Sequence, residues 1–373
     1  MTPCTVYFIV PRIHRVGGYE RQAITLAQAL PNHGARLKVL TDFQPTVPLA
    51  NCRMLPTHSI LAARAAFRRE FATARATGPV VVHVHALYRF SAVGLWTATR
   101  LKLPTLLKLP SSTDVQVLFQ SPRLSLRLFQ PTLQRVDRFL CPSRAVADEL
   151  RPFLQRPAAA TYLPNGVDTR RFLPATSEQR DRQRATLGIR FAHVILHVGR
   201  HVSLKGGDVL IRAFARARAS LPADTGLVLL GEGEETETWK RLAADLKIGP
   251  AVLFAPTHAE PERYFQAADA FVLPSRQEGL PNALLEAMAC GLPCIAANTG
   301  GIRDVLADGF ASQMVPPGDA DALAAALPGL FEAGLALGAR MRQHIETHFS
   351  IDTISQQLIA LYDELIRARN STV

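Results

Sequence analysis

Short apolar runs alternate with helical stretches along almost the whole chain. The runs are nearly continuously hydrophobic, which is typical of parallel strands covered on both faces. We expect strands at residues 4–10, 37–41, 80–84, 105–109, 139–141 and 160–163, then at 194–198, 227–230, 252–254, 270–273, 293–297 and 313–315. Amphipathic helices are predicted between them, among them 21–30, 209–219 and 239–247. Because the alternation runs through twice, the pattern predicts two doubly wound α/β domains in series.

A turn signal divides the two halves. Pro-Asn-Gly at 164–166 ends the last predicted strand of the first half, and a polar run at 176–184 precedes the next alternation. We therefore expect an N-terminal domain over residues 1–168 and a C-terminal domain over residues 169–350. The stretch 351–369 has helical periodicity, and we expect the segment 351–373 to pack back on the first domain.

Composition is that of an ordinary globular chain, with 48% apolar and 20% charged residues. No apolar run reaches the roughly 18 residues that a membrane span needs. The first ten residues predict a buried strand and not a signal peptide. The five cysteines are too scattered for a disulfide framework, and Cys290 and Cys294 lack the second Cys/His pair of a metal site. We therefore expect reduced thiols and a cytoplasmic protein.

Positive charge is concentrated in the first half. Through Arg171 the chain has 23 Lys and Arg against 8 Asp and Glu, whereas the remainder has 19 against 23. The basic half should face an anionic partner: a nucleic acid, a phospholipid surface or a phosphorylated acceptor. Cations mix with apolar residues at helical spacing over 64–71 and 123–129. Such helices can lie on an anionic bilayer, or pack their apolar stripe inward with the cations in solvent.

The most informative segment, at residues 275–291, is SRQEGLPNALLEAMACG. It follows a predicted strand, passes through a Gly/Pro loop and enters a helix with Pro near its start and Gly just past its end. The N-terminus of this helix, near 281–283, offers backbone N–H groups and a positive dipole end to an anion. Glu278 precedes the helix and Glu286 lies about one turn inside it. Two carboxylates thus flank a predicted phosphate site, where they can accept hydrogen bonds from sugar hydroxyls.

The spacing of Glu278 and Glu286, within EGLPNALLEAMACGLPCIA, resembles the signature of glycosyltransferase family 4. The resemblance implies an α/β protein of the GT-B fold, in which two Rossmann-like domains with doubly wound parallel sheets face each other across a cleft. It also implies that Glu278 contacts the sugar of a nucleotide diphosphate sugar and Glu286 the ribose hydroxyls. The backbone that would bind the diphosphate or the sugar comprises Gly279, Leu280, Pro281 and Asn282.

Two further segments carry the same resemblance. HVGRHVSLKG, at 197–206, is similar to the Gly-Arg…Lys-Gly element of the family. Arg200 and Lys205 follow a strand's carboxyl end, where α/β sheets bind ligands, and their charges can stabilise a diphosphate leaving group without a metal ion. Gly17 and Gly18 resemble the family's turn that approaches the donor from the first domain.

The resemblance runs from Gly17 to about Pro317 and is strongest over 195–300, but it fails at one position. Many relatives carry a His after the fourth strand of the first domain, near the transferred sugar, where this chain has Pro110. The residues that could replace this His are Lys108, Ser112, Asp114, His85 and His14. A lone His at a strand end is more often structural.

Two apparent motifs are discounted. Asp319-Ala320-Asp321 has the D-x-D form of metal-dependent transferases, but it follows Pro-Pro-Gly and begins an Ala/Leu helix, so we expect helix capping. Gly231-Glu232-Gly233 is only part of a dinucleotide fingerprint.

We therefore predict a metal-independent hexosyltransferase that moves a hexose-type sugar to a saccharide or lipid-linked acceptor in lipopolysaccharide or exopolysaccharide biosynthesis. The resemblance implies retention of the anomeric configuration. No residue is an obvious carboxylate nucleophile, which favours attack on the front face over double displacement. We expect no cofactor, no nucleic-acid partner, and a place in the cytoplasm, with the inner face of the plasma membrane as a candidate peripheral site for the basic half.

Two alternatives stay open. A nucleotide-sugar epimerase of the same fold would turn over the donor without any acceptor. A basic nucleic-acid-binding protein would show a steeply salt-dependent affinity for DNA or RNA. No helix-turn-helix, zinc finger or aromatic RNA-binding motif supports the second alternative.

Overall fold

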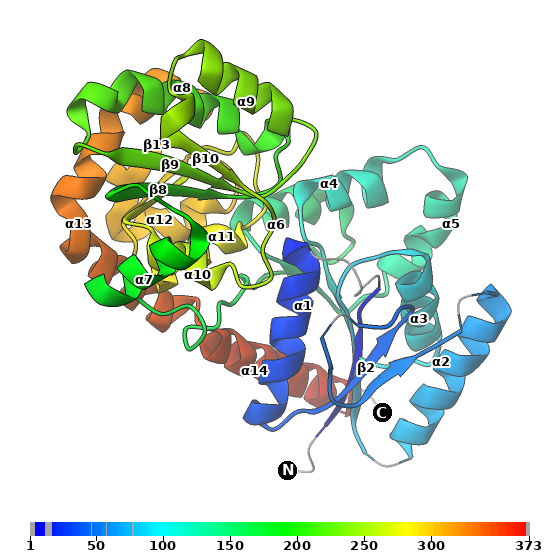
Figure 1. Ribbon diagram of the computed structural model, residues 1–373. Helices are drawn as coiled ribbons and strands as arrows, with labels where there is room; N and C mark the ends of the chain where they lie inside the picture. Colours follow the sequence, from blue (N-terminus) through cyan, green and yellow to red (C-terminus); the bar gives the residue numbers. More distant parts are fainter. Residues whose placement is uncertain (1–3, 12–16, 46, 57, 77, 371–373) are drawn as a thin grey trace. The chain divides into compact units, whose positions relative to one another are not determined.

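The structure is a computed structural model that describes residues 4–11, 17–45, 47–56, 58–76 and 78–370. The chain forms two compact units, one running to Gly166 and including the C-terminal segment from Ile351, the other spanning Val167–Ser350 (Figure 1). Each unit is built on one parallel sheet, which confirms the predicted class of two Rossmann-like α/β domains. We call them unit 1 and unit 2 and describe each by itself.

Unit 1 contains a seven-stranded sheet in the order β3-β2-β1-β4-β5-β6-β7. Its strands are β1 (Thr5–Ile9), β2 (Arg36–Thr41), β3 (Cys52–Met54), β4 (Val80–Val84), β5 (Thr105–Lys108), β6 (Arg138–Cys141) and β7 (Ala160–Tyr162). Six lie where the apolar runs predicted them. The sequence did not predict β3, because this three-residue edge strand is largely exposed and has no apolar run.

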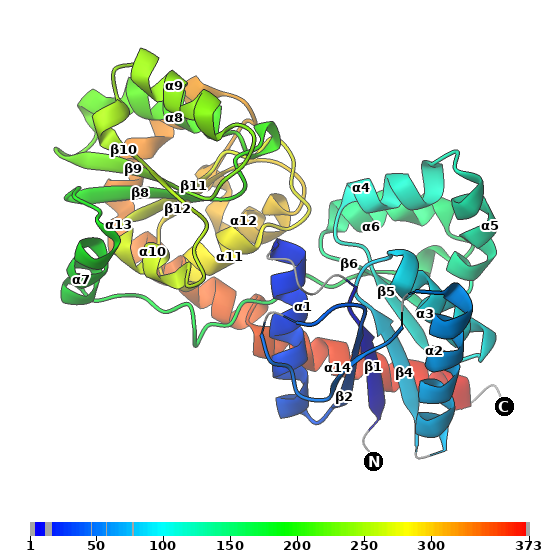
Figure 2. The ribbon, with the colours of Figure 1, turned by 45° about the vertical axis from the view of Figure 1, so that its right-hand side comes forward.

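The helices of unit 1 cover both faces of this sheet. They are α1 (Gly18–Ala29), α2 (Ile60–Arg75), α3 (Arg89–Arg100), α4 (Ser112–Val115), α5 (Leu124–Leu133), α6 (Arg144–Leu150) and α14 (Ile351–Asn370), with short 3₁₀ turns at Leu30–His33, Arg151–Phe153 and Pro157–Ala159 and a π-helical turn at Gln116–Gln120. Helices α2 to α6 contribute to one apolar cluster, and α1 with α14 to the other (Figure 2). Tyr362 of α14 is fully buried, and its hydroxyl lies 2.7 Å from His83 Nδ1 of β4. This burial fixes α14 as part of the unit 1 core.

Unit 2 contains a six-stranded sheet in the order β10-β9-β8-β11-β12-β13. Its strands are β8 (His193–Val198), β9 (Thr225–Leu230), β10 (Val252–Ala255), β11 (Ala270–Leu273), β12 (Cys294–Ala297) and β13 (Met314–Val315). All six lie at the apolar runs that predicted them.

The helices of unit 2 also form two layers. They are α7 (Ser177–Leu187), α8 (Gly207–Ala217), α9 (Thr236–Asp245), α10 (Glu262–Ala267), α11 (Asn282–Ala289), α12 (Ile302–Phe310) and α13 (Ala320–His348), with 3₁₀ turns at Ser203–Lys205, Arg218–Ser220, Gly249–Ala251 and Ala311–Gln313. Helices α8 and α9 cover one face, and α10 to α12 the other. Helix α13 bends at Gly334, where φ is +30°, so that its first half joins one layer and its second half the other.

Two polar segments illustrate how capping decides local structure. The polar run after the turn signal forms α7, whose first turn is closed by a reciprocal capping box between Thr176 and Gln179. Asp319 accepts hydrogen bonds from the backbone N–H groups of Asp321 and Ala322 at the start of α13. The D-x-D sequence is therefore a helix N-cap, as predicted.

Within the described residues, no single helix combines the length and apolarity needed to cross a membrane. One bent pair, Ala320–Glu332 with Gly334–His348, meets both criteria by length and composition alone.

The five cysteines are free thiols, and burial raises the pKa of Cys141 to about 12.

Candidate functional site

The strand order of the unit 2 sheet reverses between β8 and β11. From β8 the chain proceeds to β9 and β10 on one side, whereas β11, β12 and β13 follow on the other side. Open α/β sheets bind ligands outside the carboxyl ends of their strands at such a reversal. The loops that follow β8 and β11 carry Arg200, Lys205 and Glu278, so three of the predicted site residues lie at this edge.

The structure brings Lys205 and Glu278 into direct contact. Lys205 Nζ donates to Glu278 Oε1 at 2.6 Å, and Ser275 Oγ donates to the same oxygen at 2.7 Å. The Glu278 side chain is 8% exposed and that of Lys205 is 23% exposed. Two donors on one oxygen fix the orientation of the carboxylate, while the lysine keeps partial access to solvent.

Arg276 ties the two loops together. Its backbone N–H donates to the Leu204 carbonyl at 2.8 Å, and its guanidinium donates to both carboxylate oxygens of Asp208, at 2.8 and 2.6 Å. Partial burial raises the pKa of Asp208, but the hydrogen bonds and charge of Arg276 outweigh this effect and the net pKa is lowered. This bidentate pair clamps the loop that carries Glu278 onto the first turn of α8.

Two glycines allow the backbone of these loops to approach closely. Gly206 has φ +67° and Gly300 has φ +46°, both in the left-handed region. A Cβ at Gly206 would overlap the carbonyl oxygen of Pro274, and one at Gly300 would overlap that of Glu278. Gly206 belongs to the predicted Lys-Gly element, whereas sequence reasoning gave no role to Gly300.

Helix α11 follows the loop that carries Glu278. It begins at Asn282 with Pro281 as N-cap, and no side chain caps its first turn. Leu280 and Pro281 are buried, and Gly279 accepts a backbone hydrogen bond from Gly301 at 2.7 Å. Glu286 lies in the second turn and is almost fully buried. A buried glutamate in a helix is uncommon unless its carboxylate has hydrogen-bond partners.

The two histidines beside Arg200 are buried, and each has a hydrogen-bond partner at Nδ1. His197 Nδ1 lies 3.1 Å from the Val272 carbonyl, and His201 Nδ1 lies 2.9 Å from Thr236 Oγ1. Burial lowers the pKa of each histidine to about 4, so both are neutral at pH 7. Arg200, which lies between the two histidines in the sequence, is exposed. The positive charge at this edge therefore comes from arginine and lysine side chains, among them Arg200 and Lys205, and not from imidazolium.

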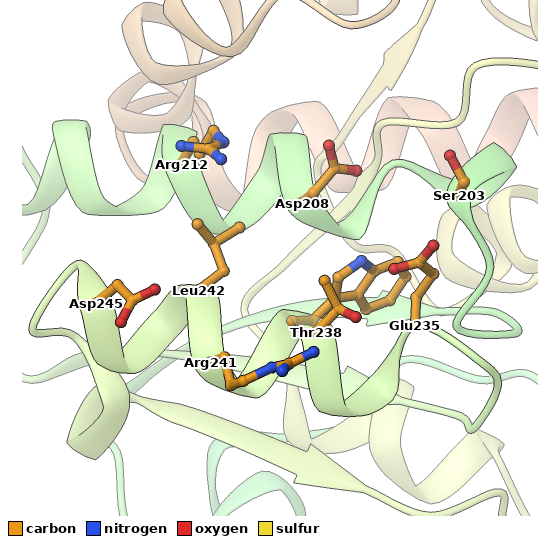
Figure 3. A pocket seen from close by; sticks show the side chains of 9 residues that line it. Ser203, Asp208, Arg212, Glu235, Thr238, Arg241, Leu242 and Asp245 are labelled. Carbon is orange, nitrogen blue, oxygen red and sulfur yellow. The ribbon is translucent and has the colours of Figure 1, made fainter.

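A separate pocket of about 540 Å³ opens between α8 and α9 (Figure 3). Asp208 and Arg212 line it from α8, and Arg241 and Asp245 from α9. It shares Asp208 with the Arg276 clamp but includes neither Lys205 nor Glu278. In the described part of the chain, no group of three or more His, Cys, Asp or Glu could hold a metal ion.

The sheet of unit 1 has its own reversal, between β1 and β4. Gly17 and Gly18 follow β1: Gly17 is the N-cap of α1, and a Cβ there would overlap the Glu20 carboxylate. His85 follows β4, with its ring 5.1 Å from that of Tyr19. Burial lowers the pKa of His85 well below its usual value, so the ring is neutral. His14 lies outside the described residues.

The other candidates for the missing family His lie after β5 and differ in burial. Lys108 is buried, and its Nζ donates to Asn165 Oδ1 at 2.7 Å. Burial lowers the pKa of Lys108 to about 7. Ser112 is half-buried at the start of α4. Asp114 accepts a hydrogen bond from Ser111 at 2.6 Å, and burial raises its pKa. Lys108 thus binds Asn165, which lies next to Gly166, the last residue of the N-terminal segment of unit 1.

Comparison with known proteins gives two family matches, one to an N-terminal and one to a C-terminal part of the chain. Residues 16–171 match the family described as Glycosyltransferase Family 4, and residues 192–333 match Glycosyl transferases group 1. A GDP-mannose-dependent alpha-(1-6)-phosphatidylinositol monomannoside mannosyltransferase of Mycolicibacterium smegmatis is 37% identical over 183 residues, which cover 46% of this chain and 47% of that protein. A D-inositol 3-phosphate glycosyltransferase of Actinosynnema mirum is 34% identical over 266 residues, covering 65% and 61%. The chain spans about half the length of the first curated relatives it matches.

Solved structures match over nearly the whole chain. A glycosyltransferase of Rickettsia africae has a TM-score of 0.81 at 18% identity and covers 98% of this chain and 99% of its own. HepE of Anabaena, solved in complex with UDP, has a TM-score of 0.77 at 18% identity and covers 96% and 100%. At this identity the likeness shows the fold.

The burial of Lys108 gives a testable pH dependence. The pKa is about 7 in the folded chain and ~10.4 in an unfolded one. Between these values the unfolded chain binds more protons, so the free energy of unfolding rises with pH, by at most about 1.4 kcal/mol per unit. We expect Lys108→Met to remove this rise in denaturant unfolding measured upward from neutral pH. The exposed Lys102→Met is the control, and an unchanged slope in Lys108→Met would refute the assignment.

Proposed function

The chain belongs to glycosyltransferase family 4 and has the GT-B fold, and we propose that it transfers a hexose from a nucleotide diphosphate sugar bound in unit 2. The observation that carries the proposal is the Lys205–Glu278 pair at the strand-order reversal, 2.6 Å apart and partly open to solvent. A cation for phosphate and a carboxylate for sugar hydroxyls stand together where an α/β sheet binds its ligand.

The charges at this edge suit a diphosphate. Arg200 and Lys205 bind its oxygens, and the N-terminal turn of α11 adds backbone donors and a positive dipole end. The loop residues that line this position are Gly279, Leu280, Pro281 and Asn282. Glu286 accepts hydrogen bonds from the ribose hydroxyls. The family resemblance also assigns donor binding to Gly17 and Gly18 of unit 1. This arrangement stabilises the leaving group without a metal ion.

Glu278 and Lys205 have different roles in the reaction. Glu278 holds the sugar by its hydroxyls, so that the anomeric carbon stays aligned with the acceptor. As the bond from the anomeric carbon to the diphosphate oxygen breaks, Lys205 and Arg200 stabilise the negative charge on that oxygen. The acceptor hydroxyl attacks on the same face and gives its proton to the departing oxygen. The anomeric configuration is retained, and no covalent enzyme intermediate forms.

The acceptor we propose is saccharide or lipid-linked and belongs to cell-surface glycan assembly. Support comes from relatives: the similar mannosyltransferases are named for phosphatidylinositol mannoside acceptors, and WaaG, which shares the fold, is described as involved in lipopolysaccharide biosynthesis. The excess of cations in residues 1–171 suits the anionic inner face of the plasma membrane as a peripheral site. GDP-mannose, named in the mannosyltransferases, is the first donor to test.

The donor site predicts a pattern of nucleotide affinities. Calorimetric titration with GDP, UDP and ADP should show one preferred nucleoside diphosphate. Lys205→Ala and Glu286→Ala should each weaken it by about tenfold or more, because each removes a charge-assisted hydrogen bond. Glu237→Ala, which removes an exposed helix glutamate paired with Lys240, should change nothing. Addition of EDTA should leave the affinity unchanged. Equal binding of all three nucleotides by every variant would overturn the donor site.

Glu278→Gln separates binding from transfer. The amide removes a negative charge from beside Lys205, so a free nucleoside diphosphate should bind as tightly as to the wild type, or several-fold more tightly. Transfer of the sugar should fall by about a hundredfold, because Glu278 no longer orients the donor. Product formation under donor saturation measures this rate. Full transfer activity in Glu278→Gln would show that the carboxylate does not hold the sugar.

A further inference from the structure

Helix α5 of unit 1 is apolar on two opposite faces. Its inward residues Leu126, Phe129 and Leu133 pack against the core of unit 1. Leu124 and Leu128, four residues apart, are 70% and 73% exposed. At 100° per residue these two leucines share one stripe, about 150° from the centre of the inward stripe. A helix in a globular protein normally presents polar residues on that outer face.

The charge within the chain segment that carries this stripe is of one sign. Residues 115–136 contain Arg123, Arg127 and Arg135 but no Asp or Glu. All three arginines are exposed, and a further apolar side chain, Val117, lies exposed in the preceding π-helical turn. Of the two acidic residues of α6, Asp148 forms an ion pair with Arg151, and Glu149 accepts a hydrogen bond from Gln116 of the π-helical turn at 3.1 Å. The outer face of α5 therefore combines exposed apolar side chains with an excess of positive charge.

The other basic segment with this composition behaves differently. In α2, Phe67 and Phe71 are fully buried. Arg64 stacks on the Trp96 ring with its guanidinium carbon 4.5 Å from the ring centroid. The exposed apolar residues of α2, Ile60 and Leu61, are confined to its first turn. Further along the helix, Glu70 is buried. The stripe of α2 is thus mainly core packing, and of the two segments only α5 keeps an apolar face in solvent.

We propose that the Leu124–Leu128 face of α5 seats unit 1 on an anionic phospholipid bilayer. The leucines enter the boundary between headgroups and acyl chains, and the arginines bind lipid phosphates above them, as in interfacial amphipathic helices. This inference rests on the proposed transfer to a membrane-associated acceptor, and it names the element that makes the contact. Bilayer attachment holds unit 1 at the surface where a lipid-linked acceptor lies.

Cosedimentation of the full chain with vesicles tests the proposal. The wild type should bind vesicles of phosphatidylcholine with phosphatidylglycerol and not vesicles of phosphatidylcholine alone. Leu124→Gln with Leu128→Gln should lower the partition coefficient by about tenfold or more, because two apolar side chains no longer leave water. Arg123→Gln with Arg127→Gln should also weaken binding and reduce its dependence on salt. The matched control, Ile60→Gln with Leu61→Gln on α2, should bind as the wild type does.

Three outcomes would overturn the assignment of α5. One is the absence of wild-type binding to anionic vesicles, and another is loss of binding in the α2 control equal to that in the α5 variant. The third is a dimer of the wild type that Leu124→Gln with Leu128→Gln converts to monomer, which would make this face a contact between two copies. Nucleoside diphosphate affinity is measured on the same samples. Normal nucleotide binding without vesicle binding would overturn α5 alone, and loss of nucleotide binding in the wild type would overturn the donor site.

Discussion

The ion pair between Lys205 and Glu278 depends on two adjacent parallel strands ending at one edge of their sheet. Strands β8 and β11 are neighbours although 71 residues separate Val198 from Ala270, and the connections that follow them leave in opposite directions. Open α/β sheets bind ligands where the connections on the two sides of a reversal leave in this way. A cation from one loop and a carboxylate from the other meet at this edge.

Holding that geometry requires more than the two residues themselves. Arg276 bridges the loops through Leu204 and Asp208, and left-handed glycines at 206 and 300 let the backbones approach without a clash. The nearby histidines are neutral because burial lowers the pKa of each. A diphosphate at this edge would meet the cations Arg200 and Lys205, and the lysine is already oriented by Glu278. Such preorganisation reduces the reorganisation that the site undergoes during the reaction.

Much of the fold could be predicted from the sequence, because buried parallel strands appear there as continuous apolar runs. Twelve of the thirteen strands among the described residues follow from that signal, whereas β3 is an exposed edge strand and leaves none. The family resemblance assigned Lys205 and Glu278 to the same donor, but their direct contact and the shared Ser275 hydroxyl are tertiary facts. The Asp208–Arg276 clamp joins residues far apart in sequence, and no local pattern marks it. Local spacing equally could not decide whether the leucines of α5 or the phenylalanines of α2 face solvent.

We propose that the loops after β8 and β11 form the nucleotide site of unit 2. Amide hydrogen exchange of the full chain, with and without saturating nucleoside diphosphate, tests it most directly, because bound ligand suppresses local opening. The account predicts slowed exchange in residues 199–206 and 275–286, with little change in α9 beside the separate pocket. Protection confined to α9, or to unit 1, with both loops unaffected would contradict it.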